Sequence, residues 1–225
     1  MAQAGIHSIV GMAVRRWVPN PKWLMLGVVL GNLLPDADNL AVAVAVLAGQ
    51  SQEGLHRTFT HSLFTIAAVV AVFSAIALIT KRRHWGNLGV GLGIGIAMHI
   101  LLDLLIWFNG VETLWPFPSW VNLWEGVTLP DWWTKLMTPL EFLFFALFFL
   151  LLDVTARKRG TDGDYLRTLR IWTGVQGALF VVFTVLAYTL ETDLMVISGA
   201  LYLLSLGLAT GVTIRMRKTV EATAR

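Results

Sequence analysis

The sequence predicts an all-α, polytopic helical membrane protein that forms a single membrane domain over residues 1–225. Hydrophobic residues make up 56% of the chain and charged residues only 14%, whereas soluble domains contain roughly 25% charged residues. The mean hydropathy is +0.68, and several windows reach the about 20 apolar residues that span a bilayer. These observations exclude an ordinary water-soluble domain.

Two short apolar segments, 6–18 and 23–34, come first, with Asn20 and Pro21 between them. Each would form a helix about 18–20 Å long, which is shorter than the hydrocarbon core of about 30 Å. We therefore predict a pair of short membrane-embedded helices that form a hairpin and rise part-way across the membrane. Pro35 is expected to end the second helix and to leave the acids that follow it in non-helical chain.

Five longer apolar segments are each predicted to cross the membrane once. They are residues 62–80, 88–108, 137–154, 171–190 and 195–214. Residues 1–120 contain the polar motifs of the chain, whereas the three C-terminal spans, within 137–214, carry no recognised motif.

Basic residues cluster at one end of these spans. Arginine and lysine gather after the first full span, between the third and fourth, and after the last, whereas the loops 109–136 and 191–194 hold one lysine and no arginine. The positive-inside rule places the basic clusters and the C-terminus in the cytoplasm and the other two loops outside it. The many tryptophans of 109–136 favour an interfacial aromatic belt.

The composition also limits chemistry and partners. The chain has no cysteine, which excludes disulfides, thiol catalysis and zinc–thiolate sites. The net charge of +3 arises mostly in short loops between spans, so no nucleic-acid partner is expected and the lipid bilayer is the expected surrounding.

Polar residues gather on the predicted extracytoplasmic side at four places in the sequence. One is a histidine near the outer end of the first short helix, and the others are the motifs PDADN, HRTFTHS and HILLD. Together they supply four imidazoles and three carboxylates as metal ligands: His7, Asp36, Asp38, His56, His61, His99 and Asp103. This mixture suits zinc, with manganese as the alternative, and it is large enough for one or two ions.

Residue spacing indicates how these side chains could converge. His99 and Asp103 are one helical turn apart and share a helix face. His56 and His61 would lie about 140° apart on a continuous helix. They converge only if a helix begins between them, and Thr60 is the expected N-cap.

The ligand set favours phosphoryl chemistry. Two-metal sites stabilise the attacking and leaving oxygens of a phosphoryl displacement, and bound water becomes hydroxide near neutral pH. Arg57 could pair with a phosphate oxygen. Asp38, Arg57 and His61 are therefore the predicted catalytic residues.

Each motif also has a purely structural explanation. Asp36 and Asp38 could belong to a turn after Pro35, and His99 with Asp103 could be an internal hydrogen-bonded pair. An ionisable residue inside a span costs about 2.5–3.5 kcal/mol, however. Four of the five histidines and three acids fall on one side, and this joint pattern favours a metal site.

Other polar residues favour structural roles. His84 is expected at the cytoplasmic surface. Glu141 is expected to complete a capping box that begins at Thr138, and Asp153 is expected to pair with Arg157 one turn later. Four glycines of the second full span are expected to permit close helix packing: Gly89, Gly91, Gly93 and Gly95.

The motifs PDADN, HRTFTHS and HILLD, followed by GVETLWPF, resemble those of the YdjM/YbcI-type membrane-bound metal-dependent hydrolases, also described as LexA-binding inner-membrane hydrolases. The resemblance covers roughly residues 5–120, and Thr58 stands where the family pattern has glycine. The family is in turn similar to zinc-dependent phospholipase C and nuclease P1. The matching positions are His7, Asp36, Asp38, His56, Arg57, Thr60, His61, Ser62, His99, Asp103, Trp115, Pro116 and Phe117.

The resemblance implies a metal-dependent hydrolase in a bacterial or archaeal cell membrane, acting on a phosphoester in a lipid or lipid-linked substrate. Two other functions would use the same ligands: a metal-ion transporter, and a non-enzymatic membrane protein stabilised by metal. A transport path should carry polar residues into the cytoplasmic half of the spans, where the sequence has almost none.

Overall fold

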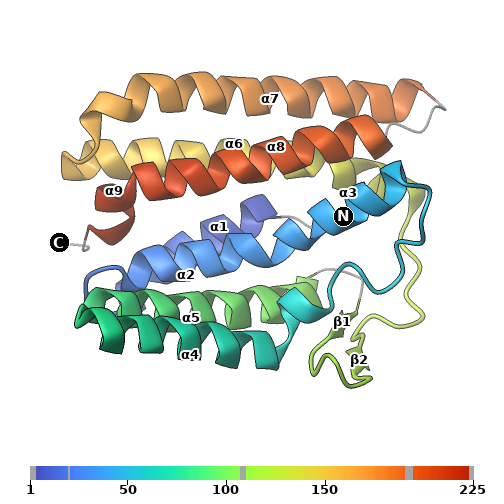
Figure 1. Cartoon of the computed structure of the whole chain (residues 1–225). Coiled ribbons are helices and arrows are strands. Elements are labelled where there is room, and N and C mark those ends of the chain that lie inside the picture. Colours follow the sequence, from blue (N-terminus) through green and yellow to red (C-terminus); the bar gives the residue numbers. More distant parts are fainter. Residues whose placement is uncertain (1–3, 20, 107–109, 191–194, 223–225) are drawn as a thin grey trace.

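The computed structural model describes residues 4–19, 21–106, 110–190 and 195–222, and most of them are helical (Figure 1). Two short strands, β1 (Val111–Glu112) and β2 (Trp120–Val121), form an antiparallel hairpin between α5 and α6. The predicted all-α membrane class is confirmed. The helices are α1 (Ala4–Ala13), α2 (Leu24–Leu33), α3 (Asn39–Leu47), α4 (Leu63–Thr80), α5 (Arg83–Ile106), α6 (Asp131–Arg159), α7 (Leu166–Thr189), α8 (Met195–Arg215) and α9 (Arg217–Glu221).

Among the described residues, six helical stretches are long and apolar enough to cross a membrane. Five of them, α4 to α8, correspond to the five predicted full spans, although residues 107 and 108 of the second lie outside the described chain. The sixth is Leu24–Leu47, which combines α2 and α3. The predicted first short helix is confirmed as α1, which a 3₁₀ turn, Val14–Trp17, continues.

The helical chain does not end at Pro35, as was predicted for the second short helix. α2 stops before the proline, but a 3₁₀ turn, Leu34–Asp38, carries the chain directly into α3. Pro35 is the second residue of this turn, where the missing N–H of a proline costs no hydrogen bond. Asp36 and Asp38 therefore lie in helical chain, and the expectation of non-helical chain here is wrong.

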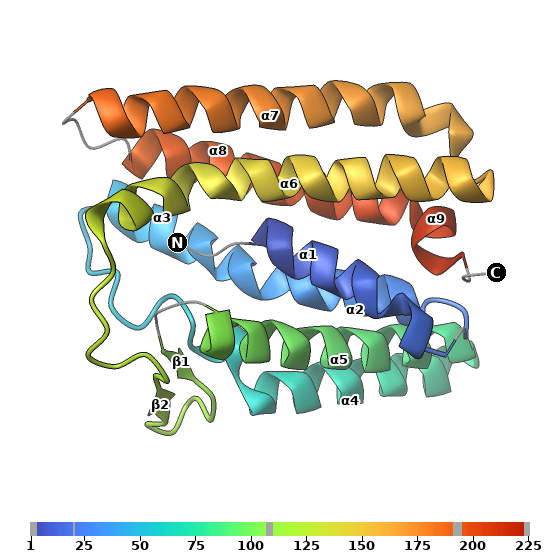
Figure 2. The same cartoon turned by 180° about the vertical axis from the view of Figure 1, so that it is seen from behind.

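The helices form layers, with α7 outermost, then α6 and α8, then α1 and α2, and finally α5 and α4 (Figures 1 and 2). The main core lies where α1 and α2 pack against α6, α8 and α9. It includes Val28, Leu33, Phe145, Phe149 and Leu206, which are all buried. The outward sides of α4 and α7 expose apolar side chains, as expected of helices that face lipid.

Glycines bring α2 and α5 into backbone contact, as predicted. A Cβ atom on Gly95 would lie 2.3 Å from the Val28 carbonyl oxygen, and one on Gly31 would lie 2.3 Å from that of Leu92. The alternate glycines of α5 face α4 instead, where a Cβ on Gly89 would lie 2.4 Å from a side-chain atom. α5 thus packs closely between two neighbours.

Two other polar predictions agree with the structure. Asp153 accepts from Arg157 Nε at 2.6 Å, as predicted, and Arg170 joins the pair at 3.3 Å. His84 is partly exposed, as expected of a surface residue, and its ring lies edge-on to Trp23 with centroids 4.1 Å apart.

The predicted capping box is wrong. α6 begins at Asp131, so Pro139 lies inside the helix and Glu141 is buried nearly three turns beyond the start. The helix starts earlier, and the Pro130 carbonyl accepts the backbone N–H groups of two first-turn residues. These N–H groups are donors that a helix start must otherwise satisfy with side-chain acceptors.

The α2–α5 contact makes a testable prediction about stability. We expect Gly95→Ala to lower the free energy of unfolding by about 1–3 kcal/mol or more, because the added methyl group overpacks a backbone contact. Gly177→Ala in α7 is the matched control, since a Cβ there meets no atom within 4 Å and alanine favours a helix by about 0.5–1 kcal/mol. Thermal unfolding in detergent measures both, and equal melting temperatures would contradict the prediction.

Candidate metal centre

Polar side chains from four separate parts of the chain meet where α2 and α5 lie side by side. They come from α1, from the 3₁₀ turn before α3, from the loop before α4 and from the last turns of α5. The structure brings all seven predicted ligands into this cluster, and all but His56 are buried: His7, Asp36, Asp38, His56, His61, His99 and Asp103. His56 keeps 23% of its side chain exposed.

Four donor atoms face one another at the centre of the cluster. His61 Nε2 lies 3.0 Å from His99 Nε2. Asp36 Oδ1 lies 3.9 Å and 3.6 Å from these two nitrogens, and Asp103 Oδ2 lies 3.5 Å and 3.7 Å from them. Donor atoms about 2.0–2.1 Å from a tetrahedral zinc ion lie about 3.3 Å apart. Asp36, His61 and His99 offer three donor atoms within 4.8 Å of one another, so these three could share one ion, and Asp103 Oδ2 lies close to the same two nitrogens.

His7 extends the cluster beyond these four atoms. Its Nε2 lies 3.2 Å from Asp103 Oδ1, the oxygen that does not contact the central pair. Its ring stacks on that of His99, with centroids 3.8 Å apart. His7, His99 and Asp103 therefore offer a second group of three donor atoms within 4.8 Å of one another.

Hydrogen bonds on the outer side of each central imidazole leave its Nε2 lone pair pointing inward. His99 Nδ1–H donates to the Asn32 carbonyl at 2.9 Å. Thr60 Oγ1 donates to Asp38 Oδ2 at 2.8 Å, so it accepts from His61 Nδ1–H, also at 2.8 Å. Two neutral imidazoles then present lone pairs to each other, and this arrangement requires a cation between them, either a metal ion or a proton.

The buried charges of the cluster do not balance among themselves. Asp36, Asp38 and Asp103 are buried together with the Arg57 guanidinium, whose Nε lies 3.4 Å from Asp103 Oδ2. Within the described chain, no hydrogen bond reaches either oxygen of Asp36 or Asp103, nor Nε and Nη1 of Arg57. Burial lowers the pKa of His61 below its usual range, which keeps this imidazole neutral. Uncompensated buried charges cost several kcal/mol each, so the donor set fits a divalent cation.

Asp38 differs from Asp36 because hydrogen bonds engage both of its oxygens. Oδ2 accepts from the Arg57 backbone N–H at 3.0 Å and from Thr60. Oδ1 accepts from His56 Nδ1 at 2.7 Å. His56 Nε2 has no hydrogen-bond partner among the described residues. Asp38 thus orients the groups around it, whereas Asp36 keeps its oxygens free.

The loop before α4 is held in place from both sides. Arg57 adopts a left-handed conformation with φ of 60°, which is costly for a residue other than glycine. Its backbone N–H donates to Asp38, and its carbonyl accepts from the Glu112 N–H in β1 at 2.9 Å. The Leu63 N–H donates to the Thr113 carbonyl, also at 2.9 Å. The β1–β2 hairpin therefore supports the loop that presents the histidines.

The prediction that Thr60 caps the next helix is wrong. Ser62 is the N-cap of α4, and its hydroxyl accepts a backbone N–H of the first turn at 3.2 Å. His61 belongs to a 3₁₀ turn that precedes this cap. The Thr60 hydroxyl oxygen accepts from His61 Nδ1–H instead of from a backbone N–H of α4.

Two buried polar residues support the cluster and were not predicted to do so. Asn32 holds His99 through its carbonyl. Glu141 Oε1 accepts the Gly5 N–H at 3.3 Å, at the start of the helix that carries His7. The role of Asn32 leaves no signal in the sequence, because a backbone carbonyl makes the contact while the side chain donates to the Val28 carbonyl.

Removing a central ligand should remove bound metal. We expect His99→Ala and Asp36→Asn each to lower zinc affinity by more than about 10–100-fold, the loss that follows from removing an outer-shell partner alone. Elemental analysis of purified protein and competition with a chelator measure this loss. His84→Ala, on the same helix but outside the cluster, should bind as the wild type does. Wild-type protein that binds no metal would instead assign a proton to the position between the two Nε2 atoms.

Comparison with known proteins places the chain in a family. No curated protein and no solved structure matches it. The family described as YdjM inner membrane protein matches residues 2–208, a range that contains the whole cluster and extends through α7 into α8. The apolar helices agree with an integral membrane protein. With most of its length matched, the chain belongs to the YdjM inner membrane protein family.

Proposed function

We propose that the chain is a membrane-embedded, metal-dependent hydrolase that cleaves a phosphoester in a lipid or lipid-linked substrate. The observation that carries this proposal is the buried approach of two imidazole Nε2 atoms to 3.0 Å, beside carboxylates that have no hydrogen-bond partner among the described residues. A second observation indicates a negatively charged substrate. The Arg57 guanidinium beside the cluster has N–H groups with no hydrogen-bond partner within the described chain.

The central ion would be held by His61, His99, Asp36 and Asp103. His7, together with the other oxygen of Asp103, could hold a second ion, so one or two ions are proposed. Imidazole and carboxylate donors favour zinc, with manganese as the alternative. When bound, the cation would supply Lewis acidity toward a phosphoryl oxygen and would lower the pKa of a water molecule.

Arg57 is proposed to bind the phosphoryl group. Its Nε lies 3.4 Å from Asp103 Oδ2, which places the guanidinium at the edge of the ligand set. A guanidinium offers N–H donors in a planar fork that matches two phosphate oxygens. Because Arg57 is buried, its charge is weakly screened and favours an anionic substrate.

Asp38 and His56 are proposed to move a proton, and with Asp36 they also offer a third group of three metal-donor atoms within 4.8 Å of one another. The Asp38 carboxylate accepts from His56 Nδ1, so the opposite nitrogen, Nε2, carries the lone pair. Side-chain pairs of this kind act as general bases, because the carboxylate fixes the tautomer and stabilises the imidazolium. His56 Nε2 is buried and has no hydrogen-bond partner among the described residues, so its lone pair is free to accept a proton.

The transporter alternative is less well supported. Toward the other end of α2 and α5, glycines bring the two backbones into direct contact, and a Cβ on Gly91 would lie 2.2 Å from the Leu24 carbonyl oxygen. Such a contact leaves no room for a hydrated ion between these two helices.

A phosphoesterase assay with Arg57 variants tests the proposed function. We expect metal-loaded protein to cleave at least one member of a panel of soluble and lipid phosphoesters. Arg57→Ala should lower kcat/KM by about 10²–10³-fold, as removal of one charge-stabilising donor does, without loss of metal. Arg167→Ala, at an exposed position of α7, is the control. Failure of the wild type to cleave any phosphoester would refute the proposal.

The site is proposed to open on the extracytoplasmic side, with the C-terminus in the cytoplasm. Because the chain has no cysteine, single-cysteine variants report the orientation directly. We expect a membrane-impermeant maleimide to label Glu125→Cys, in the exposed segment after the β1–β2 hairpin, in intact cells. Lys158→Cys, at the far end of α6, should react only after permeabilisation. The reverse pattern would show the opposite orientation.

A further inference from the structure

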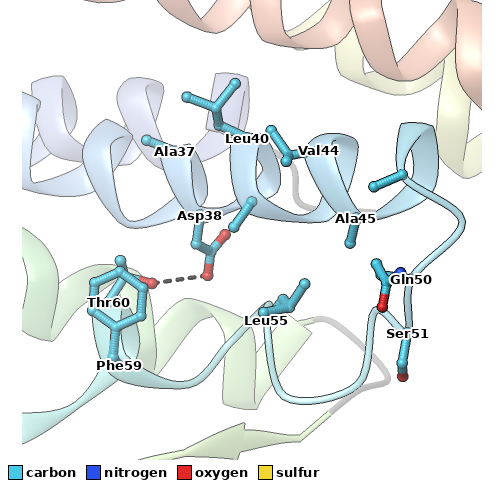
Figure 3. A pocket seen from close by; sticks show the side chains of 12 residues that line it. Ala37, Asp38, Leu40, Val44, Ala45, Gln50, Ser51, Leu55, Phe59 and Thr60 are labelled. Atoms are coloured by element: carbon cyan, nitrogen blue, oxygen red, sulfur yellow. Dashed lines mark hydrogen bonds between the residues drawn. The ribbon is translucent and has the colours of Figure 1, made fainter.

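A groove of about 710 Å³ runs between α3 and the loop that joins α3 to α4 (Figure 3). α3 forms one wall with Leu40 and Val44, and the loop forms the other with Leu55 and Phe59. Apart from Asp38 at one end, the residues that line this groove lie outside the ligand cluster.

The lining of the groove is apolar except at its ends. Asp38 and Thr60 lie at one end, with their hydrogen bond between them, and Gln50 and Ser51 lie at the other (Figure 3). Between these ends the walls carry alanine, valine, leucine and phenylalanine side chains. Such a surface fits a hydrocarbon chain and offers little to a polar ligand.

The rim of the groove is exposed as well as apolar. Leu40 is 61% exposed, Val44 60% and Phe59 45%. α3 belongs to the candidate span Leu24–Leu47, so in a membrane these side chains meet lipid, and apolar chains can enter the groove from the side. A groove of this volume lies within the range of about 300–1,000 Å³ that suits one small molecule, and it is too small for a helix about 10–12 Å wide.

The polar end of the groove is continuous with the ligand cluster. The Thr60 hydroxyl lies 2.8 Å from Asp38 Oδ2 and 2.8 Å from His61 Nδ1. The opposite nitrogen of the same imidazole, Nε2, faces the centre of the cluster. One residue, Thr60, therefore separates the apolar groove from the donor atoms.

We propose that this groove holds one hydrocarbon chain of the substrate, so that the substrate is an amphiphilic phosphoester of the membrane. The inference rests on the proposed function for its headgroup chemistry. The chain lies along α3, and the phosphoryl group reaches past Thr60 to the cluster and Arg57. A soluble phosphoester occupies only the polar end and gains nothing from the groove.

Photo-crosslinking tests chain binding without any need for turnover. The probe is phosphatidic acid with a diazirine at the end of one acyl chain, added to the full-length protein in detergent. We expect cross-links to concentrate in residues 40–59, and we expect Val44→Trp, which fills the groove, to reduce them about tenfold, a loss of about 1.4 kcal/mol in binding. Val185→Trp is the matched control, since Val185 is 54% exposed on α7. Ala41→Trp provides a second groove-filling variant if the first does not fold.

Hydrolysis of two matched substrates completes the test. Val44→Trp should lower kcat/KM for a long-chain phosphoester about tenfold and leave a short-chain soluble phosphoester unchanged. Cross-links spread evenly over α3 and α7, or equal effects on both substrates, would overturn the groove assignment. Cross-links in the groove without cleavage of any phosphoester would instead refute the hydrolase and retain the chain site. The two failures are therefore distinguishable.

Discussion

The close approach of α2 and α5 is the contact on which the rest of the structure depends. Glycines let the two backbones touch along several turns, and this brings the Asn32 carbonyl within 2.9 Å of His99 Nδ1. The same contact carries Asp36, just beyond α2, to the last turns of α5. A larger side chain at these glycines would move the helices apart and separate donor atoms that now lie 3–4 Å from one another.

Charge is the second constraint. A membrane protein gains little by burying three carboxylates in one place, because each costs several kcal/mol unless it is compensated. Asp38 is compensated by hydrogen bonds from Arg57, Thr60 and His56. Asp36 is not compensated in this way by any described residue. This contrast between neighbouring carboxylates divides the cluster into an outer part that orients side chains and an inner part that fits a cation.

The elements around the cluster each hold one of its members. The β1–β2 hairpin fixes the backbone of Arg57 in a left-handed conformation, and Glu141 of α6 receives the N-terminal N–H of the helix that bears His7. The family match extends well past the motifs to residue 208. The C-terminal helices contribute to the fold of the site through α6, which packs against α1, although they supply none of the predicted ligands.

The sequence by itself determined the membrane class, the five long spans and the seven residues that gather in the cluster. These follow from hydropathy, length and residue type, which are local properties of the chain. The sequence also indicated that the glycines of α5 pack closely. It did not determine the continuation of α2 through Pro35 into α3, because a proline that ends one helix can also begin the next turn.

Only the tertiary structure decided that Asp38 orients the side chains around it while the oxygens of Asp36 stay without hydrogen-bond partners among the described residues. The partners of Asp38 lie about 20 residues away in the chain. The tertiary structure also decided that Ser62 caps α4, whereas the Thr60 hydroxyl pairs with Asp38 and His61. The apolar groove beside the cluster arises from α3 and a loop folded against it, and neither segment has an unusual composition by itself. Such features depend on contacts between distant residues, which hydropathy and spacing do not encode.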